Sequence, residues 1–544
     1  MYRINKTINI SRRQQTVKFN ILISDPLSED GIYPLREADN LNVQLDTGLS
    51  ESELLEKVKD VDGLLVRSQT QVTREVIEHA HQLKVIARAG VGVDNIDLEA
   101  ATENGIVVVN APDGNTNSAA EHTMAMIMSL SRNIPQAYLS IKEKKWDRKS
   151  FVGVELRGKT LGIVGLGRIG AEVAKRAKGM RMNVIAYDPF FSQEKAEAMG
   201  INCGTLDEVL AAGDFITVHT PLLKETKHLI NKEAFDKMKD GVRVVNCARG
   251  GIIDEDDLYD ALQSGKVAGA GLDVFEEEPA VDHKVLTLPQ VIATPHLGAS
   301  TKEAQENVAI DVSHDVVRIL GGGLARNPVN IPSVPRDVMR KIEPYFYLSE
   351  KLGLFLAHLP DEAIEEININ FSGDLTALEI KPLTQNTLKG LLSRHLGTHV
   401  NNVNAAYLAE RKGITIHENK TSAARGFTNL MTVEVITKNT SRKVAGTLLN
   451  GLGARIVKVD DYSMDVVPEG HLLLIHHQDQ PGAIGRVGSL LAENDVNIAT
   501  MQVGREHIGG SAIMMLSIDR PMEKEELEQI RSMEGFEQVT AVDL

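Results

Sequence analysis

Short apolar runs that alternate with polar stretches of helical length make up the first part of the chain. The stretch Ser50–Val61, between the first two runs, has the polar character of an exposed helix. Strands that alternate with helices predict a parallel sheet. The predicted strands before residue 115 are Phe19–Ser24, Gly63–Val66, Lys84–Ala87 and Ile106–Val109. An α/β domain is therefore expected ahead of the rest of the chain.

A second α/β unit begins later and contains the most specific motif of the sequence. The apolar run Lys159–Val164 leads into Gly165-Leu166-Gly167-Arg168-Ile169-Gly170, and a predicted helix, Ala171–Ala177, follows. The next apolar run, Asn183–Tyr187, ends at Asp188. Strand, glycine-rich turn, helix, strand and terminal acid in this order are the dinucleotide-binding fingerprint.

The residues of this fingerprint have separate roles. Gly165 permits the tight turn, Gly167 lets the backbone approach a pyrophosphate, and Gly170 lets helix and strand pack closely. The helix N-terminus offers free N–H groups and a positive dipole end to the anion. Asp188 would accept hydrogen bonds from the adenosine ribose and repel a 2′-phosphate, and Pro189-Phe190-Phe191 offer that phosphate no arginine. The expected cofactor is therefore NAD rather than NADP.

The nucleotide unit is long. Later apolar runs bring its predicted strands to about six, the usual number for this sheet. These runs are Phe215–Val218, Val242–Asn246, Val267–Val274 and Val291–Thr294. A Met-rich helix, Ser118–Leu130, precedes the unit, and a helix near Lys302–Ile319 closes it. The following Gly321-Gly322-Gly323, with Pro328, Pro332 and Pro335, is typical of a linker.

The pattern changes after this linker. Residues 336–465 mix predicted helices with strands such as Ile367–Phe371 and Thr432–Thr437, without a recognisable catalytic motif. From residue 471 the order strand, helix, strand, strand, helix, strand predicts a ferredoxin-like domain. Its elements are expected at Leu472–His476, Ile484–Asn494, Asn497–Val503, Ser511–Ile518, Lys524–Met533 and Val539–Val542.

Composition narrows the possible roles. A length of 544 residues implies about three or four domains. Contents of 42% hydrophobic and 25% charged residues are ordinary for a globular protein. The net charge of −16 disfavours nucleic acid or an anionic membrane as a partner, and no apolar run is long enough to span a membrane.

Cys203 and Cys247 lack metal or disulfide spacing, so we expect a reducing compartment and no metal. The basic segment 1–18 is interpreted as a tail rather than a transit peptide.

Three motifs that follow the fingerprint lie at the carboxyl ends of predicted strands. They are Asn246–Gly251, Asp273–Pro279 and Thr294–Gly298. Ligands of open parallel sheets bind at this edge, so the three motifs are expected to surround one cofactor. A nicotinamide enzyme that oxidises a secondary alcohol needs a base for the hydroxyl proton, and histidine suits this task. A carboxylate would orient the imidazole, and an arginine would bind a substrate carboxylate.

The motifs supply one candidate for each role, namely His296, Glu278 and Arg249. Taken singly, each has a plainer interpretation: a structural loop histidine, part of a solvated acidic run, and an ordinary ion-pair partner. Their combination after a well-placed fingerprint favours an active site.

These motifs resemble the D-isomer-specific 2-hydroxyacid dehydrogenases, and the resemblance extends from about Phe19 to Pro328. It explains why the fingerprint comes late. It implies a flavodoxin-like substrate domain at 19–116 and 301–328, with a Rossmann NAD-binding domain inserted into it at 117–300. An α+β intervening domain at 336–465 and a ferredoxin-like ACT regulatory domain at 471–544 would follow.

The resemblance also implies the role of each site residue. Arg249 would orient the substrate carboxylate, His296 would be the acid/base, and Glu278, the glutamate directly before the proline, would support it. The residues implied for the cofactor are Thr70, Gly165, Gly167, Arg168, Ile169, Gly170, Asp188, Thr220, Cys247, Ala248, Arg249, Asp273, His296 and Gly298. Those implied for the substrate are Arg67, Ser68, Gly90, Val91, Gly92 and Asn110. Arg67 and the glycine-rich backbone are candidates for binding a phosphate.

Family members that carry both an intervening domain and an ACT domain after the catalytic domains oxidise 3-phospho-D-glycerate with NAD in the first step of L-serine synthesis. The resemblance therefore implies this activity, a cytoplasmic tetramer and an interface near Ser118–Leu130. It makes L-serine a candidate effector near Asp479 and Asn497. Some relatives have an asparagine where this chain has Asp479. A carboxylate there could still accept a hydrogen bond from the ammonium group of an amino acid, but it would repel the carboxylate group.

Two other interpretations stay open. The chain could reduce glyoxylate or hydroxypyruvate, although such enzymes usually lack the two extensions. It could instead be a non-catalytic NAD-sensing protein, which the acidic charge and the sensor-like C-terminal domain disfavour.

Overall fold

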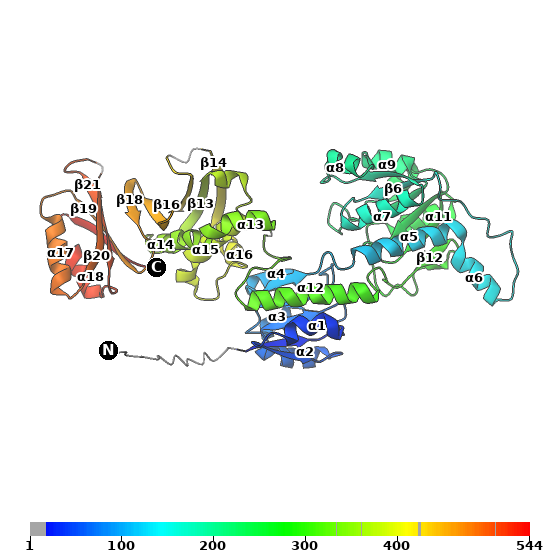
Figure 1. The fold of residues 1–544 in the computed structure, drawn as a ribbon, viewed down its shortest axis with the longest axis horizontal. Coiled ribbons are helices and arrows are strands. Elements are labelled where there is room, and N and C mark those ends of the chain that lie inside the picture. Colours follow the sequence, from blue (N-terminus) through cyan, green and yellow to red (C-terminus); the bar gives the residue numbers. More distant parts are fainter. Residues whose placement is uncertain (1–17, 333, 361, 423–425, 506) are drawn as a thin grey trace, which may run out of the picture.

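The computed structural model describes residues 18–544 except 333, 361, 423–425 and 506. The expected tail therefore lies outside the described residues, apart from Lys18. Within the described part of the chain, four sheets form four successive units, which Figure 1 shows from blue to red.

The first sheet has the strand order β2-β1-β3-β4-β5, and all its pairings are parallel. This is the flavodoxin-like order, as expected. Its strands are β1 (Phe19–Ile23), β2 (Leu41–Leu45), β3 (Gly63–Val66), β4 (Val85–Arg88) and β5 (Val107–Asn110). Its helices are α1 (Glu29–Arg36), α2 (Glu51–Lys57), α3 (Arg74–His79) and α4 (Leu98–Glu103). The sequence did not predict β2, because this edge strand is short and half exposed and alternates apolar with polar residues.

Helix α12 (Lys302–Leu320) returns the chain to this first unit. Figure 1 shows it in green beside the blue domain. It packs closely on α1, because a side chain at Gly31 would collide with Ala309. The segment after it is more than a linker: Val329 N–H donates to Val108 O at 2.8 Å, and Asn330 Oδ1 accepts from Val108 N–H at 2.9 Å. The return segment is thus bound along the edge of β5.

The second sheet has the parallel order β12-β11-β10-β9-β6-β7-β8, which is a Rossmann arrangement with one added strand. Its strands are β6 (Thr160–Val164), β7 (Asn183–Tyr187), β8 (Asn202–Cys203), β9 (Phe215–Val218), β10 (Val242–Asn246), β11 (Val267–Leu272) and β12 (Val291–Ala293). Its helices are α5 (Thr116–Arg132), α6 (Ile134–Lys142), α7 (Arg168–Gly179), α8 (Gln193–Ala198), α9 (Leu206–Ala212), α10 (Lys232–Lys237) and α11 (Glu255–Gln263). The described residues thus hold one more strand than predicted, because β8 is an exposed pair of residues with no apolar run.

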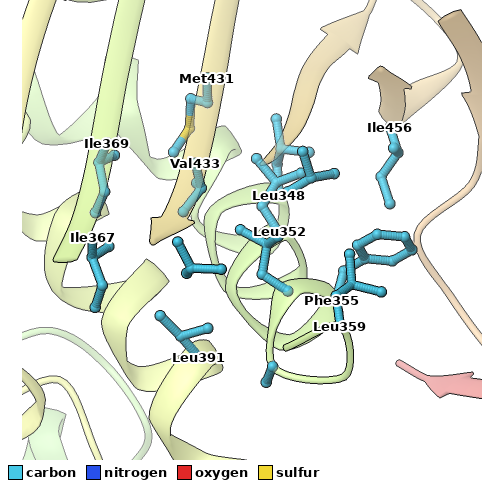
Figure 2. Packing of buried hydrophobic residues seen from close by; sticks show 14 of the residues in the cluster. Leu348, Leu352, Phe355, Leu359, Ile367, Ile369, Leu391, Met431, Val433 and Ile456 are labelled. Atoms are coloured by element: carbon cyan, nitrogen blue, oxygen red, sulfur yellow. The ribbon is translucent and has the colours of Figure 1, made fainter. Parts of the chain in front are cut away.

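The third sheet is mixed, with the order β14-β13-β15-β16-β17-β18. Its strands are β13 (Ile364–Gly373), β14 (Thr415–Thr421), β15 (Asn429–Thr437), β16 (Ser441–Leu449), β17 (Gly453–Val459) and β18 (Tyr462–Val466). Its helices are α13 (Arg336–Ile342), α14 (Phe346–Leu356), α15 (Lys381–Leu396) and α16 (Ala405–Arg411). Figure 2 shows Leu348, Leu352 and Phe355 of α14 packed between Leu391 and the sheet residues Val433 and Ile456.

The fourth sheet is antiparallel, with the order β20-β21-β19-β22. Its elements are β19 (His471–Gln478), α17 (Ala483–Glu493), β20 (Ile498–Arg505), β21 (Ser511–Ile518), α18 (Lys524–Arg531) and β22 (Phe536–Asp543), in the ferredoxin-like order that the sequence predicts. Leu472, Leu474, Ile513, Met515 and Val542 of this sheet join the buried core of the third unit. One face of the fourth sheet therefore shares a hydrophobic core with the third unit, whereas its other face forms a separate core with α17 and α18.

None of the described helices is long and apolar enough to cross a membrane.

Candidate active site

A cavity of about 660 Å³ lies between the first two units. One wall comes from the loops after β3 and β4, including Arg67, Ser68 and Gly90 to Gly92. The other wall comes from the loops after β10, β11 and β12, including Arg249, Glu278 and His296. Parallel sheets place the carboxyl ends of their strands at one edge, so the topology brings these distant segments together.

His296 and Glu278 form a hydrogen-bonded pair in this cavity. The Nδ1 atom of His296 lies 2.9 Å from Glu278 Oε2, and the other oxygen, Oε1, accepts from Phe275 N–H at 3.1 Å. A carboxylate can only accept, so Nδ1 carries the proton and Nε2 keeps a lone pair. His296 is about half exposed, with a side-chain exposure of 48%. The pair is thus arranged as an oriented general base that solvent or substrate can reach.

Asp273 fixes the loop that carries His296. Its carboxylate accepts from Thr294 Oγ1 at 2.6 Å, from Leu297 N–H at 2.7 Å and from Gly298 N–H at 2.8 Å. Burial alone would raise the pKa of Asp273, but hydrogen bonds from His122, Thr294 and Leu297 N–H hold it below its usual value. Because both oxygens are already engaged, Asp273 acts here as the scaffold of the histidine loop.

Three arginines surround the cavity: Arg67, Arg88 and Arg249. Arg249 donates to Ala248 O at 2.7 Å and lies 3.6 Å from Asp94 Oδ2. Burial, and to a smaller extent the positive charge of nearby Arg249, lowers the pKa of Arg88 to about 10. The three side chains are partly buried and their like charges repel one another, so the cavity suits a substrate with more than one negative group.

Arg88 lines the cavity but was not among the site residues expected from the sequence. Its position as the last residue of β4, at the carboxyl edge of the sheet, is the signal that could have identified it. Conversely, Asn110 does not line the cavity. It donates through Nδ2 to Val91 O and so supports the loop at Gly90 to Gly92.

The glycine-rich turn has the geometry that its fingerprint predicts. Gly165 has φ 97°, and a side chain at Gly170 would collide with Gly165 O. Within the described residues, Gly167 faces open space, and no side chain caps the N-terminus of α7, where Arg168 and Ile169 begin the helix. Asp188 accepts from Leu166 N–H at 2.9 Å and from Phe190 N–H at 2.8 Å. This turn is thus an open cradle of N–H groups for an anion.

The residues beside the turn also fit a dinucleotide. Thr220 Oγ1 and His219 Nδ1 are buried without a hydrogen-bond partner among the described residues, which points to an interaction with a ligand. Burial lowers the pKa of His219 to about 4 and raises that of Cys247 to about 12, so both side chains are neutral near this site. Thr70 differs, because its hydroxyl donates to Asp25 Oδ1 at 2.7 Å and it does not line the cavity.

The two expected effector residues do not form one site within the chain. Asp479 lies 3.1 Å from Arg505 Nη1 and accepts from Gly509 N–H at 3.1 Å. These two interactions hold its pKa below the usual value. Asn497 donates to Asp519 Oδ2 at 3.1 Å, at the opposite end of β21. Asp479 follows the carboxyl end of β19, whereas Asn497 precedes the amino end of β20. These two strands run in the same direction, because each is antiparallel to β21, so the two residues lie at opposite ends of the sheet. The part of the chain that the structure describes also contains no cluster of side chains suited to a metal ion.

Comparisons with known proteins agree with this site. Residues 124–298 match the model of the D-isomer specific 2-hydroxyacid dehydrogenase NAD binding domain, and NAD is the cofactor of this unit. Residues 341–460 match the D-3-phosphoglycerate dehydrogenase intervening domain, and residues 471–535 match the ACT domain. Among solved structures, D-lactate dehydrogenase from Aquifex aeolicus, complexed with NAD and lactic acid, is 32% identical, with a TM-score of 0.52. The match covers 58% of this chain and 100% of that one.

Two curated relatives, both named D-3-phosphoglycerate dehydrogenase, extend the similarity over nearly the whole chain. The one from Bacillus subtilis is 48% identical over 97% of this chain and 100% of its own length. The one from Methanocaldococcus jannaschii is 46% identical over 96% of this chain and 99% of its own. The chain therefore belongs to the D-3-phosphoglycerate dehydrogenase family, within the D-isomer-specific 2-hydroxyacid dehydrogenases.

Proposed function

We propose that this chain oxidises 3-phospho-D-glycerate to 3-phosphohydroxypyruvate with NAD, the first step of L-serine synthesis. The relatives named above support this substrate. The observation that carries the proposal is the convergence of three arginines and a His–Glu pair in one cavity. The substrate has a carboxylate, a phosphate and a hydroxyl group between them, and the cavity has a group for each.

The residues divide the work as follows. Arg249 binds the carboxylate, and Arg67 and Arg88 bind the phosphate. His296 Nε2 accepts the hydroxyl proton, and the Glu278 carboxylate stabilises the resulting imidazolium through Nδ1. The glycine-rich turn would hold NAD, and bound NAD would supply the hydride acceptor for the carbon that bears this hydroxyl group. Loss of the hydroxyl proton to His296 and of a hydride from this carbon converts the alcohol to the ketone.

Steady-state kinetics test this assignment. The substrates are 3-phospho-D-glycerate and D-2-hydroxyglutarate in the oxidising direction, and glyoxylate and hydroxypyruvate in the reducing direction, each with both nicotinamide cofactors. We expect the highest kcat/KM for 3-phospho-D-glycerate with NAD. A higher kcat/KM for glyoxylate or hydroxypyruvate would favour the reductase alternative. Background rates on all four would favour a NAD-sensing protein.

We also propose that L-serine regulates the enzyme through the C-terminal ACT domain, because its family usually binds amino acids. Asp479 and Asn497 lie at opposite ends of the sheet. A site that uses both would therefore need a second copy of the chain. Initial rates at millimolar L-serine are the test. Unchanged rates in an enzyme that stays assembled would remove serine as the effector.

Assembly is a related proposal. In the nucleotide unit, Met124, Ile127 and Leu130 of α5 are buried within their own chain. Met128 of α5 is exposed, and a run of exposed apolar side chains follows on α6 and the loop after it: Ile134, Tyr138, Leu139, Ile141, Trp146 and Val152. Figure 1 shows α6 projecting from the rest of its unit. We infer that the family tetramer includes an interface through α6, next to the helix that the sequence indicated. Light scattering of wild type and of Leu139→Asp tests this, and an unchanged mass would contradict it.

Two further expectations remain proposals. The domain boundaries are 19–116 with 301–328, 117–300, 336–465 and 471–544, and the four separate sheets support this division. A cytoplasmic location is favoured by Cys203 and Cys247, which are both free thiols in the described structure. Limited proteolysis and cell fractionation test the two proposals.

A further inference from the structure

Asp25 contacts the loop that carries Arg67. It follows β1 at the carboxyl edge of the first sheet, and the residue is only 2% exposed. Four donors converge on its carboxylate, and all of them come from one loop. They are Arg67 N–H at 2.6 Å, Gln69 N–H at 3.3 Å, Thr70 N–H at 3.1 Å and Thr70 Oγ1 at 2.7 Å. Asp25 thus determines where the backbone of this loop lies.

Asn95 holds the same loop from the other side. Its Nδ2 atom donates to Arg67 O at 2.8 Å and to Thr70 O at 2.7 Å. Asn95 belongs to the loop after β4; the end of β4 contributes Arg88 to the cavity, and this loop contributes Gly90 to Gly92. One carboxylate therefore orders the first substrate loop, and that loop is bound in turn to the second.

We propose that Asp25 is a positioning residue for the phosphate of the substrate: its buried carboxylate holds residues 67–70 in the conformation that presents Arg67 and Ser68 to the cavity. Asp25 itself does not line the cavity, so it acts through the loop. The inference rests on the proposed function, because it takes 3-phospho-D-glycerate as the substrate.

Substitution by asparagine isolates this role. Asn is almost isosteric, but it replaces one acceptor oxygen with an NH₂ group that would face an N–H or O–H donor of the loop. A buried donor without an acceptor is costly, so the loop should leave its present position. The glycine-rich turn and Asp188, on the other unit, take part in none of these contacts.

Asp62 provides a matched control. It is a buried aspartate of the same sheet, 6% exposed, whose carboxylate accepts from Asn20 N–H at 2.9 Å and from Lys84 Nζ at 2.7 Å. It directly precedes β3, so it lies at the amino edge of the sheet, away from the cavity. Asp62→Asn should therefore destabilise the same domain without moving the substrate loops.

The experiment compares wild type, Asp25→Asn and Asp62→Asn in the full-length enzyme by thermal unfolding, NAD titration and kinetics on 3-phospho-D-glycerate. Both variants are expected to unfold at a lower temperature than the wild type. Only Asp25→Asn should raise KM for 3-phospho-D-glycerate, by about tenfold, with a much smaller effect on the Kd of NAD and on kcat. If Asp25→Asn does not fold, Asn95→Ala loosens the same loop and should give the same selective rise in KM.

The outcomes separate the two claims. A wild type that does not oxidise 3-phospho-D-glycerate refutes the proposed function, and the inference with it. If the wild type is active, a folded Asp25→Asn variant with the wild-type KM refutes the inference but not the proposed function. An equal rise in KM for Asp62→Asn also refutes it, because the effect would then be one of general stability.

Discussion

The backbone of His296 adopts φ 56°, a conformation that side-chain-bearing residues rarely occupy. Two carbonyls lie within hydrogen-bonding distance of its N–H, Asp273 O at 2.9 Å and Thr294 O at 3.0 Å. Such a conformation costs about 1–3 kcal/mol and persists only where the surroundings impose it. Here Asp273 imposes it and so directs the imidazole into the cavity.

The histidine itself can be tested by substitution. His296→Gln keeps a polar side chain that can reach Glu278, but it cannot accept the hydroxyl proton. We expect kcat to fall by about 10²- to 10⁴-fold, with a small change in KM. His283→Gln is the control, because His283 Nε2 lies 3.2 Å from Glu255 and its ring does not line the cavity. Near-wild-type kcat in a folded His296→Gln would exclude histidine as the base.

At the scale of single elements, helix α7 contains its own comparison. Gly170 and Gly179 lie at its two ends. A Cβ atom at Gly170 would collide with Gly165 O, whereas one at Gly179 would meet no described atom within 4 Å. The first glycine therefore sets the distance between the helix and the glycine-rich turn, and the second does not.

This difference gives a prediction for cofactor binding. Gly170→Ala should push α7 away from the turn and weaken NAD binding by about tenfold or more, since overpacking costs about 1–3 kcal/mol. Gly179→Ala should leave the Kd of NAD unchanged and stabilise the helix slightly. Fluorescence titration of both variants with NADH measures the effect. Equal affinities would contradict the assigned role of Gly170.

The sequence predicted those elements whose signal is a continuous run of neighbouring residues. The buried parallel strands have continuous apolar runs, so β3 and β9 were predicted to the residue. The edge strands β2 and β8 were missed because an exposed strand has no such run. Asp25 was missed for another reason. Its hydrogen bonds reach more than 40 residues along the chain, and only the sheet order brings β1 beside β3.

At the scale of the whole molecule, the third and fourth units are joined by polar contacts as well as by a shared core. Arg442 of β16 lies 3.0 Å from Asp460 and reaches across to His476 Nε2 of β19 at 3.2 Å. Burial, with the nearby Arg442, lowers the pKa of His476 to about 4. A neutral His476 is therefore part of the folded junction, where it accepts from a cation.

This pKa predicts how stability depends on pH. The unfolded histidine binds its proton near pH 6.5, whereas the folded one binds it only near pH 4, so stability falls as the pH decreases through this interval. His476→Gln keeps an acceptor that does not titrate and should reduce this dependence. The comparison is between His476→Gln and the wild-type protein. Thermal unfolding between about pH 7.5 and about pH 5 measures both proteins. An unchanged pH dependence in His476→Gln would refute the assignment.

The shared core leads to a prediction about independent folding. Five buried side chains of the fourth sheet, Leu472, Leu474, Ile513, Met515 and Val542, pack against the third unit. Burial stabilises each by about 1.5–3 kcal/mol, so exposing all five would cost on the order of 10 kcal/mol. This equals the whole stability of a typical domain. Residues 471–544 alone should therefore bind a hydrophobic dye or associate, whereas residues 336–544 should unfold in one cooperative transition. The measurements are calorimetry and dye binding on both fragments. A monomeric 471–544 fragment that melts at the same temperature as within 336–544 would show that the two units are energetically separate. Effector binding to the C-terminal sheet would then not need to act through this core.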